Sequence, residues 1–307
     1  MVNIAIFGST GMLGSTLTNV LSASSNTIFE FNRKGRSVSG RNSTYKFDAL
    51  SNYDFKILFR GLKIDYIINC IGIVNKLIDT EDINSLQQTI TVNRILPANL
   101  NEFSLQAGIP VITIGTDCVF SGKSGLYSES DSFDPTDHYG ETKCDGEKLS
   151  PDAMLIRCSI IGREIKTSYS LLEWVLTQRE KSTIDGYVNH LWNGVTTLHF
   201  SKVIEGIIAK ADFSPGAFHL VPKDVASKYD LIKLITAKFG RSDLRVDRFV
   251  HPTSINRTLK TNNPLRNLRF WQNGGYNEPP SIAEMISNYE DWTVTRKLQE
   301  SERAKYE

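Results

Sequence analysis

A strand, a glycine-rich turn and a helix follow one another at the start of the chain, and this order constrains the fold more than any other feature. Residues 2–7 are a short apolar run, and apolar side chains at helical spacing extend as far as Leu21. Between them lies Gly8-Ser9-Thr10-Gly11-Met12-Leu13-Gly14. This setting is typical of a pyrophosphate site, because backbone N–H groups at the N-terminus of a helix attract an anion.

The three glycines have different expected uses. Gly8 permits the tight turn, Gly11 lets backbone N–H groups approach a pyrophosphate, and Gly14 lets the helix lie close to the strand. The spacing G-x-x-G-x-x-G differs from the standard G-x-G-x-x-G, so a plain glycine turn is the alternative interpretation. We favour a dinucleotide site, with contacts predicted at Gly8, Thr10, Gly11, Met12 and Leu13.

Apolar strand candidates, the last of them at 154–162, alternate with helical patterns as far as residue 162. This alternation predicts an α/β fold with a doubly wound parallel sheet. The alternation then stops, although a helix at 200–211 and a strand at 217–221 are expected to return to the sheet. We expect a dinucleotide-binding domain over 1–162, joined again by about 195–222, and a smaller C-terminal α/β substrate-binding region over 163–194 and 223–307.

Two further segments have expected roles. Residues 82–107 have the pattern of one long helix, with a bend expected at Pro97. Asn93 lies inside this helix and is expected to be a buried amide that bonds to backbone. Residues 122–137 form a polar, glycine-bearing loop that is long enough to suggest a function.

The residues after the next strands indicate how a dinucleotide would be held. The strand at 27–31 ends in Asn32-Arg33-Lys34, where NAD sites usually carry an acid for the ribose 2′-hydroxyl. Because a guanidinium can grip a phosphate, NADP(H) is the preferred cofactor and NAD(H) the second choice; a solvated basic turn is the alternative. Asp48 either contacts the adenine edge or caps a helix at 51–60. Further predicted cofactor contacts are Ala49 and, at the end of the apolar strand 65–72, Cys70, Ile71 and Gly72.

Composition narrows the function classes. The 307 residues carry a net charge of +1, which argues against nucleic acid or a membrane surface as a general partner. No apolar run approaches the roughly 20 residues that span a bilayer, and residues 1–7 lack the features of a signal peptide. The four cysteines, Cys70, Cys118, Cys144 and Cys158, show no C-x-x-C spacing, so we expect neither disulfides nor a metal site. A reducing, cytoplasmic location is expected.

Tyr139 and Lys143 stand four residues apart in a segment expected to be helical, which places them on one face. An ammonium next to a phenol favours the phenolate and lowers the pKa of the phenol, so Tyr139 could exchange a proton with an oxygen on a reacting carbon. Thr116 follows the apolar run 111–114 and could hold the same oxygen. Carbonyl reduction or alcohol oxidation requires such groups, although tyrosine–lysine pairs also occur on helix surfaces as plain packing.

These motifs resemble those of the extended short-chain dehydrogenase/reductases over nearly the full chain. Within that superfamily, residues 116–122 (T-D-C-V-F-S-G) are similar to the T-D-Y-V-F-D-G of the dTDP-4-dehydrorhamnose reductases. The resemblance implies a Rossmann fold and reduction of the 4-keto group of a nucleotide-linked deoxysugar by NADPH or NADH, for polysaccharide precursor synthesis. Besides the glycine turn, the markers are Asn69 to Gly72, Asn93, Thr116, Tyr139-Gly140-x-x-Lys143 and Arg157.

The resemblance also implies roles for individual residues. Tyr139 would donate a proton to the sugar C4 oxygen, Lys143 would tune Tyr139 and hold the nicotinamide ribose, and Thr116 would orient the carbonyl. A homodimer through the helices around Tyr139 is expected. The alternatives are a non-catalytic NADP-binding regulatory subunit and a nucleotide-sugar epimerase. The predicted substrate contacts are Val74, Asp117, Cys118, which departs from the family's tyrosine, Val119, and Trp192, which either stacks on a base or sugar or packs in the core.

Overall fold

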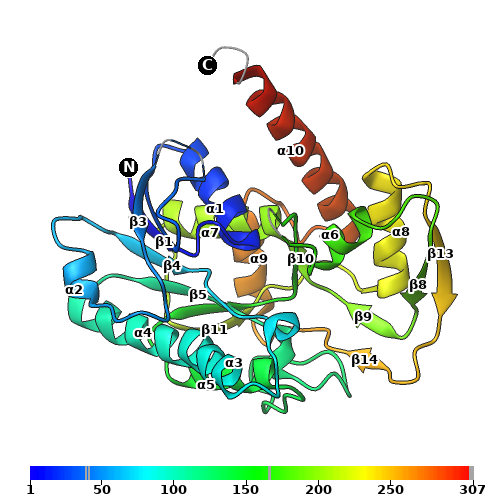
Figure 1. The fold of residues 1–307 in the computed structure, drawn as a ribbon, viewed down its shortest axis with the longest axis horizontal. Helices are drawn as coiled ribbons and strands as arrows, with labels where there is room; N and C mark the ends of the chain where they lie inside the picture. Colours follow the sequence, from blue (N-terminus) through cyan, green and yellow to red (C-terminus); the bar gives the residue numbers. More distant parts are fainter. Residues whose placement is uncertain (39, 41, 165–166, 304–307) are drawn as a thin grey trace.

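The computed structural model describes residues 1–38, 40, 42–164 and 167–303 (Figure 1). Its central sheet consists of seven parallel strands: β1 (Asn3–Phe7), β2 (Thr27–Asn32), β3 (Ser43–Lys46), β4 (Tyr66–Asn69), β5 (Val111–Gly115), β6 (Met154–Arg157) and β11 (Gly216–His219). They lie in the order β11-β6-β5-β4-β1-β2-β3. The direction of winding reverses between the paired strands β1 and β4, and doubly wound sheets bind ligands at that point.

The inner strands are buried on both faces, as their apolar sequences predict. In β1, Ile4 and Ile6 belong to the core on one face, whereas Ala5 and Phe7 belong to the core on the other. Helices therefore cover both faces (Figure 1). On the first face lie α1 (Met12–Ala23), α7 (Thr197–Ala209) and α9 (Pro264–Asn273), and on the second lie α2 (Phe55–Leu58), α3 (Ile83–Ile90), α4 (Leu96–Ala107) and α5 (His138–Lys148).

The rest of the chain forms a smaller α/β region, with α6 (Leu171–Leu176), α8 (Lys228–Lys238) and α10 (Ile282–Arg303). Its small sheets pair β7 (Ile160–Ile161) with β10 (Val195–Thr196), β8 (Thr183–Tyr187) with β13 (Arg245–Phe249), and β9 (His190–Trp192) with both β12 (Ala226–Ser227) and β14 (Ile255–Asn256). The chain returns to the central sheet where β11 pairs with β6 and α7 packs on α1. The division into two domains stays an interpretation.

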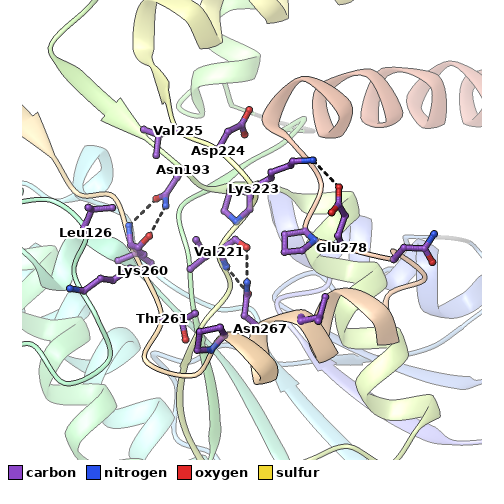
Figure 2. A pocket seen from close by; sticks show the side chains of 16 residues that line it. Leu126, Asn193, Val221, Lys223, Asp224, Val225, Lys260, Thr261, Asn267 and Glu278 are labelled. Atoms are coloured by element: carbon purple, nitrogen blue, oxygen red, sulfur yellow. Dashed lines mark hydrogen bonds and ion pairs between the residues drawn. The ribbon is translucent and has the colours of Figure 1, made fainter.

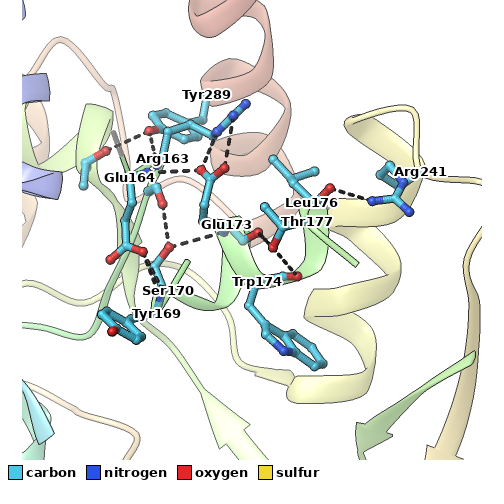
Figure 3. Close-up of polar contacts among 12 residues, drawn as sticks. Arg163, Glu164, Tyr169, Ser170, Glu173, Trp174, Leu176, Thr177, Arg241 and Tyr289 are labelled. Atoms are coloured by element: carbon cyan, nitrogen blue, oxygen red, sulfur yellow. Dashed lines mark hydrogen bonds and ion pairs between the residues drawn. The ribbon is translucent and has the colours of Figure 1, made fainter. Parts of the chain in front are cut away.

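A polar cluster anchors α10 to the rest of the molecule (Figure 3). The Arg163 guanidinium grips both carboxylate oxygens of Glu173, with Nε donating at 2.6 Å and Nη2 at 3.2 Å. The Tyr289 hydroxyl of α10 accepts hydrogen bonds from the Arg163 backbone N–H (2.8 Å) and from Thr197 Oγ1 (3.1 Å). Thr16 of α1 also bonds to Thr197 (3.1 Å). The C-terminal helix is thus tied to the helix that follows the glycine turn.

Two local predictions need correction. Residues 154–162 form the separate strands β6 and β7 and not one strand. The long helix at 82–107 is interrupted by a π-helical turn at Thr91–Ile95, and Pro97 stands in the first turn of α4, where a missing N–H is tolerated. Within the described part of the chain, none of the helices combines the length and the apolar character needed to cross a bilayer.

Candidate active site

The glycine turn has a geometry that fits a diphosphate. Gly8 has a φ of +80°, and its N–H bonds to the Phe31 carbonyl of β2 (2.8 Å). Gly11 is the N-cap of α1, and no described side chain caps this helix, so its first N–H groups can receive an anion. A Cβ at Gly14 would lie 2.1 Å from the Gly8 carbonyl oxygen, so only glycine lets α1 approach the turn this closely.

The structure gives Asn32 a different role from the predicted cofactor contact. Its side chain is 3 % exposed and organises the turn that follows β2. Its Nδ2 donates to Ser9 Oγ and to the Arg36 carbonyl, both at 3.0 Å, and its Oδ1 accepts from the Lys34 N–H (3.2 Å). The amide is therefore engaged within the protein. Arg33 and Lys34 are exposed beyond this turn, where a phosphate could reach them.

The helix-cap alternative for Asp48 is wrong. Asp54 caps α2 instead, with Oδ1 accepting from the Lys56 N–H (2.7 Å), whereas Asp48 Oδ1 accepts from the Leu50 N–H (3.1 Å). An adenine contact at Asp48 stays a prediction. Ala49 is 6 % exposed and packs in the core of the second face, so its methyl group is not open to a ligand.

The loop after β4 lies beside the glycine turn. β1 and β4 end at the same level of the sheet, and a Cβ at Gly8 would lie 2.9 Å from Ile71 Cγ1. Gly72, one residue further, is exposed. Burial raises the pKa of Cys70 to about 12, so its thiol stays neutral near physiological pH. The structure thus brings the predicted contacts Cys70, Ile71 and Gly72 beside the glycine turn.

Asn93 holds the following segment in place. Its Oδ1 accepts from the Ile73 N–H (2.9 Å), and its Nδ2 donates to the Ile73 carbonyl (2.9 Å) and to Thr142 Oγ1 of α5 (3.3 Å). This arrangement confirms the buried amide bonded to backbone. Val74, the next residue, is 41 % exposed, so its predicted substrate contact is sterically open and stays a prediction.

The three predicted catalytic side chains converge at the carboxyl end of β5. Thr116 follows β5 and begins the 3₁₀ turn η3 (Asp117–Val119), with its Oγ1 accepting from the Cys118 N–H (3.2 Å). The Thr116 side chain lies close enough to the Tyr139 phenol to lower the pKa of that phenol. Lys143, one turn further along α5, is 8 % exposed, and its Nζ donates to the Ile114 carbonyl of β5 (2.9 Å).

The predicted lowering of the Tyr139 pKa is not found. Burial, reinforced by the neighbouring Cys118 sulfur, raises the pKa of Tyr139, and the nearby Thr116 side chain opposes this shift. Burial also lowers the pKa of Lys143, whose ammonium is directed at the Ile114 carbonyl. A phenol with a raised pKa stays protonated near neutral pH, which is the state that a proton donor requires.

Two cations from the C-terminal region face Asp117: Lys228, and Arg257 from the basic stretch that begins at Arg245. Burial raises the pKa of Asp117, and the charges of Arg257 and Lys228 oppose that shift. Arg257 Nε donates to the Phe120 carbonyl (2.9 Å), and its Nη1 lies 3.5 Å from Cys118 Sγ. Arg257 therefore brings a polar group to the position where Cys118 replaces the family's tyrosine. It lies 139 positions away in the chain, so no local signal could have revealed the contact.

Two predicted substrate contacts have buried side chains. Val119 is fully buried and packs with Phe120 and Leu259, so a substrate contact by its side chain is wrong. Trp192 is 3 % exposed and packs in the main core, so of its two predicted roles the structure shows core packing and not stacking on a base or sugar. The Trp192 ring instead supports Lys228, whose Nζ lies 5.9 Å from the ring centre.

A hollow lies in the C-terminal region, and Figure 2 shows the side chains that line it. It encloses about 670 Å³ between residues 221–225, 259–261 and 277–279. The ion pair of Lys223 and Glu278 (2.8 Å) lies on its wall. None of Thr116, Tyr139 and Lys143 is among the described residues that line it. The described residues also contain no group of three or more His, Cys, Asp or Glu side chains that could hold a metal ion.

Comparisons with known proteins identify the family. The model of the RmlD substrate binding domain matches residues 2–266. Over 170 residues the chain is 26 % identical to the "Probable low-salt glycan biosynthesis reductase Agl14" of Haloferax volcanii (51 % of this chain, 52 % of that protein). Over 141 residues it is 27 % identical to a dTDP-4-dehydrorhamnose reductase of Aggregatibacter actinomycetemcomitans (43 % and 47 %). The matches thus span about half the length of these curated relatives.

A solved structure confirms the fold. The crystal structure of dTDP-4-dehydrorhamnose reductase from Bacillus anthracis, in complex with NADP, matches with a TM-score of 0.74 at 18 % identity, covering 94 % of this chain and 99 % of that one. The seven-stranded parallel sheet flanked by helices is therefore a Rossmann-like α/β fold, as the sequence predicted. Because the family model covers most of its length, the chain belongs to the RmlD substrate binding domain family.

Proposed function

We propose that the protein is an NAD(P)H-dependent reductase of the 4-keto group of a nucleotide-linked deoxysugar. The observation that carries this proposal is the convergence of Thr116, Tyr139 and Lys143 at the carboxyl end of β5. A phenol, an alcohol and an ammonium are the groups that carbonyl reduction requires, and a turn that fits a diphosphate lies on the same sheet. The family and the reductases among the relatives support the proposal.

Each of these groups has a definite task in the proposed reaction. When bound, the nicotinamide cofactor supplies hydride to the carbonyl carbon. Thr116 Oγ1 accepts from the Cys118 N–H (3.2 Å) and donates to Asp117 Oδ1 (3.4 Å), and in the proposed reaction this hydroxyl proton turns to the substrate carbonyl oxygen. Tyr139 transfers its phenolic proton to that oxygen, and its raised pKa ensures that the proton is present beforehand. Lys143 stabilises the phenolate that remains and binds the nicotinamide ribose.

The cofactor and the substrate are held by different regions in this proposal. The N–H groups at the start of α1 bind the diphosphate of the cofactor, and the exposed Arg33 and Lys34 bind a 2′-phosphate, so NADP(H) is preferred over NAD(H). Asp117 and Arg257 contact the nucleotide sugar. We further propose a cytoplasmic homodimer that supplies precursors for a surface polysaccharide.

The test is an assay of the purified protein with a panel of 4-keto-6-deoxy nucleotide sugars. The loss of reduced-nicotinamide absorbance is followed with NADPH and with NADH. We expect NADPH to be oxidised only when a keto sugar is present. Tight cofactor binding without turnover would favour the regulatory subunit instead, and conversion of a sugar to its epimer without net cofactor consumption would favour the epimerase.

A further inference from the structure

Glu147 extends the catalytic face of α5 by one more turn. Tyr139, Lys143 and Glu147 are spaced at i, i+4 and i+8, so their side chains share one side of the helix. The Glu147 side chain is 5 % exposed, and its Oε2 accepts from Arg157 Nε (2.8 Å) and Nη2 (2.7 Å). Both bonds use the same oxygen. Glu147 Oε1 is buried and has no hydrogen-bond partner among the described residues.

Arg157 is itself held from several sides. Its Nη1 lies 3.1 Å from His219 Nε2, and His219 Nδ1 lies 2.7 Å from the Lys260 carbonyl oxygen. A carbonyl can only accept, so Nδ1 carries the proton and Nε2 accepts from Arg157. Burial lowers the pKa of His219, which keeps the ring neutral. The guanidinium carbon also lies 5.0 Å from the ring centre of Phe133 and 6.0 Å from that of Phe120. The carboxylate of Glu147 is therefore fixed in position.

The same carboxylate acts on Lys143. Burial lowers the pKa of Lys143, and the negative charge of Glu147 is the largest influence that raises it. Burial raises the pKa of Glu147, and the positive charges of Arg157 and Lys143 oppose that shift. Apart from the Arg157 cation, the titratable groups near this pair are Cys118, Cys144 and Tyr139, whose pKa values are raised by burial, so they are neutral near physiological pH. Glu147 is thus the charge that offsets the desolvation of the ammonium.

We propose that Glu147 is a positioning residue for Lys143: its buried carboxylate, which lies one turn further along the same face of α5 and is fixed by Arg157, is the counter-charge of the ammonium. It acts through Lys143 and does not touch the reacting atoms, and this inference rests on the role of Lys143 in the proposed reductase. A buried ammonium without this counter-charge loses its proton more easily, and a neutral amine stabilises a phenolate poorly. The Lys260 carbonyl, through His219 and Arg157, thereby connects the C-terminal region to the catalytic helix.

The test compares Glu147→Gln with Asp145→Asn. Both variants remove one negative charge from α5, but the Asp145 side chain is 44 % exposed and pairs with Arg94 of the π-helical turn. The titration of Lys143 is followed by NMR in the full chain with carbon-13 at lysine Cε, and Lys143→Arg identifies its signal. We expect the Lys143 pKa to fall by about one to two pH units in E147Q and to stay unchanged in D145N. An equal Lys143 pKa in E147Q and the unaltered protein overturns the proposal.

The E147Q variant leaves Arg157 buried without a counter-charge and could therefore fail to fold. A second variant covers that case. Glu147→Gln combined with Arg157→Gln removes both charges, and a smaller fall of the Lys143 pKa is expected. In active variants, the alkaline limb of kcat/KM moves to lower pH by the same amount, because the ammonium is lost earlier. The NMR titration requires no turnover. The titration therefore tests the role of Glu147 separately from the proposed reductase activity. A protein in which Lys143 titrates as expected but which reduces no keto sugar contradicts only the proposed function.

Discussion

Replacing Gly14 with alanine would place a methyl carbon 2.1 Å from the Gly8 carbonyl oxygen and 2.8 Å from its carbonyl carbon. Carbon–oxygen contacts are normally no shorter than about 3.3 Å, so α1 must move away from the turn by roughly 1 Å. The obstructing atoms are backbone and cannot rotate aside. We expect a loss of about 1–3 kcal/mol of folding free energy, reduced by at most about 1 kcal/mol because alanine favours a helix over glycine.

The same displacement should weaken cofactor binding. The first N–H groups of α1 move with the helix, and each charge-assisted hydrogen bond to a phosphate contributes about 1.5–3 kcal/mol. Loss of one such bond raises the Kd for NADPH about ten- to a hundredfold. Stability is measured by urea denaturation and affinity by a fluorescence titration of the folded protein.

Gly11→Ala is the matched control. Gly11 has φ −77° and ψ 174°, which any residue adopts, and a Cβ there would lie at an ordinary 3.4 Å from the Gly8 oxygen. This variant should keep its stability but bind NADPH more weakly, because its methyl group stands where the diphosphate approaches. If G14A is as stable as the unaltered protein and binds NADPH equally well, the reasoning about the glycine turn is refuted.

Two further predictions address the cofactor phosphate and the pH dependence of stability. The Arg33→Ala/Lys34→Ala variant should lower the affinity for NADPH relative to NADH by about tenfold or more, whereas Arg60→Ala/Lys63→Ala, with the same charge change, should leave the ratio of the two Kd values unaltered. Burial of His199 lowers its pKa to about 3 in the folded protein. As the pH falls below the ordinary pKa of histidine, this side chain is therefore protonated in the unfolded chain but still neutral in the folded one. Stability should therefore decrease by about 2 kcal/mol between about pH 8 and about pH 5 through this residue, and the decrease should be absent from urea titrations of His199→Gln.

The order of strands and helices could be predicted because it depends on local patterns. The apolar runs, the glycine turn and the helical spacing of Tyr139 and Lys143 each lie within a few residues, and the structure has the corresponding elements in the predicted order. The hydrogen bonds of Asn93 to the Ile73 backbone could also be predicted, since a buried amide side chain inside a helix needs hydrogen-bond partners.

The directions of side chains could not be predicted in the same way. Asn32 and Val119 stand next to the expected cofactor and substrate, yet the amide closes its own turn and the valine points into a core. Burial of Tyr139 depends on segments far away in the sequence, which is why its pKa moves opposite to the predicted direction. Arg257 and Glu147 act through contacts with Cys118 and Arg157 that only the folded chain creates.

The most direct test of the account is the turnover of Tyr139→Phe with NADPH and a 4-keto nucleotide sugar, measured together with its Kd for NADPH. The phenylalanine ring retains the shape of the side chain but has no proton to give. We expect the turnover to fall by about 10²–10⁴ while cofactor affinity stays nearly the same. Turnover equal to that of the unaltered protein would contradict the assignment of Tyr139 as the proton donor.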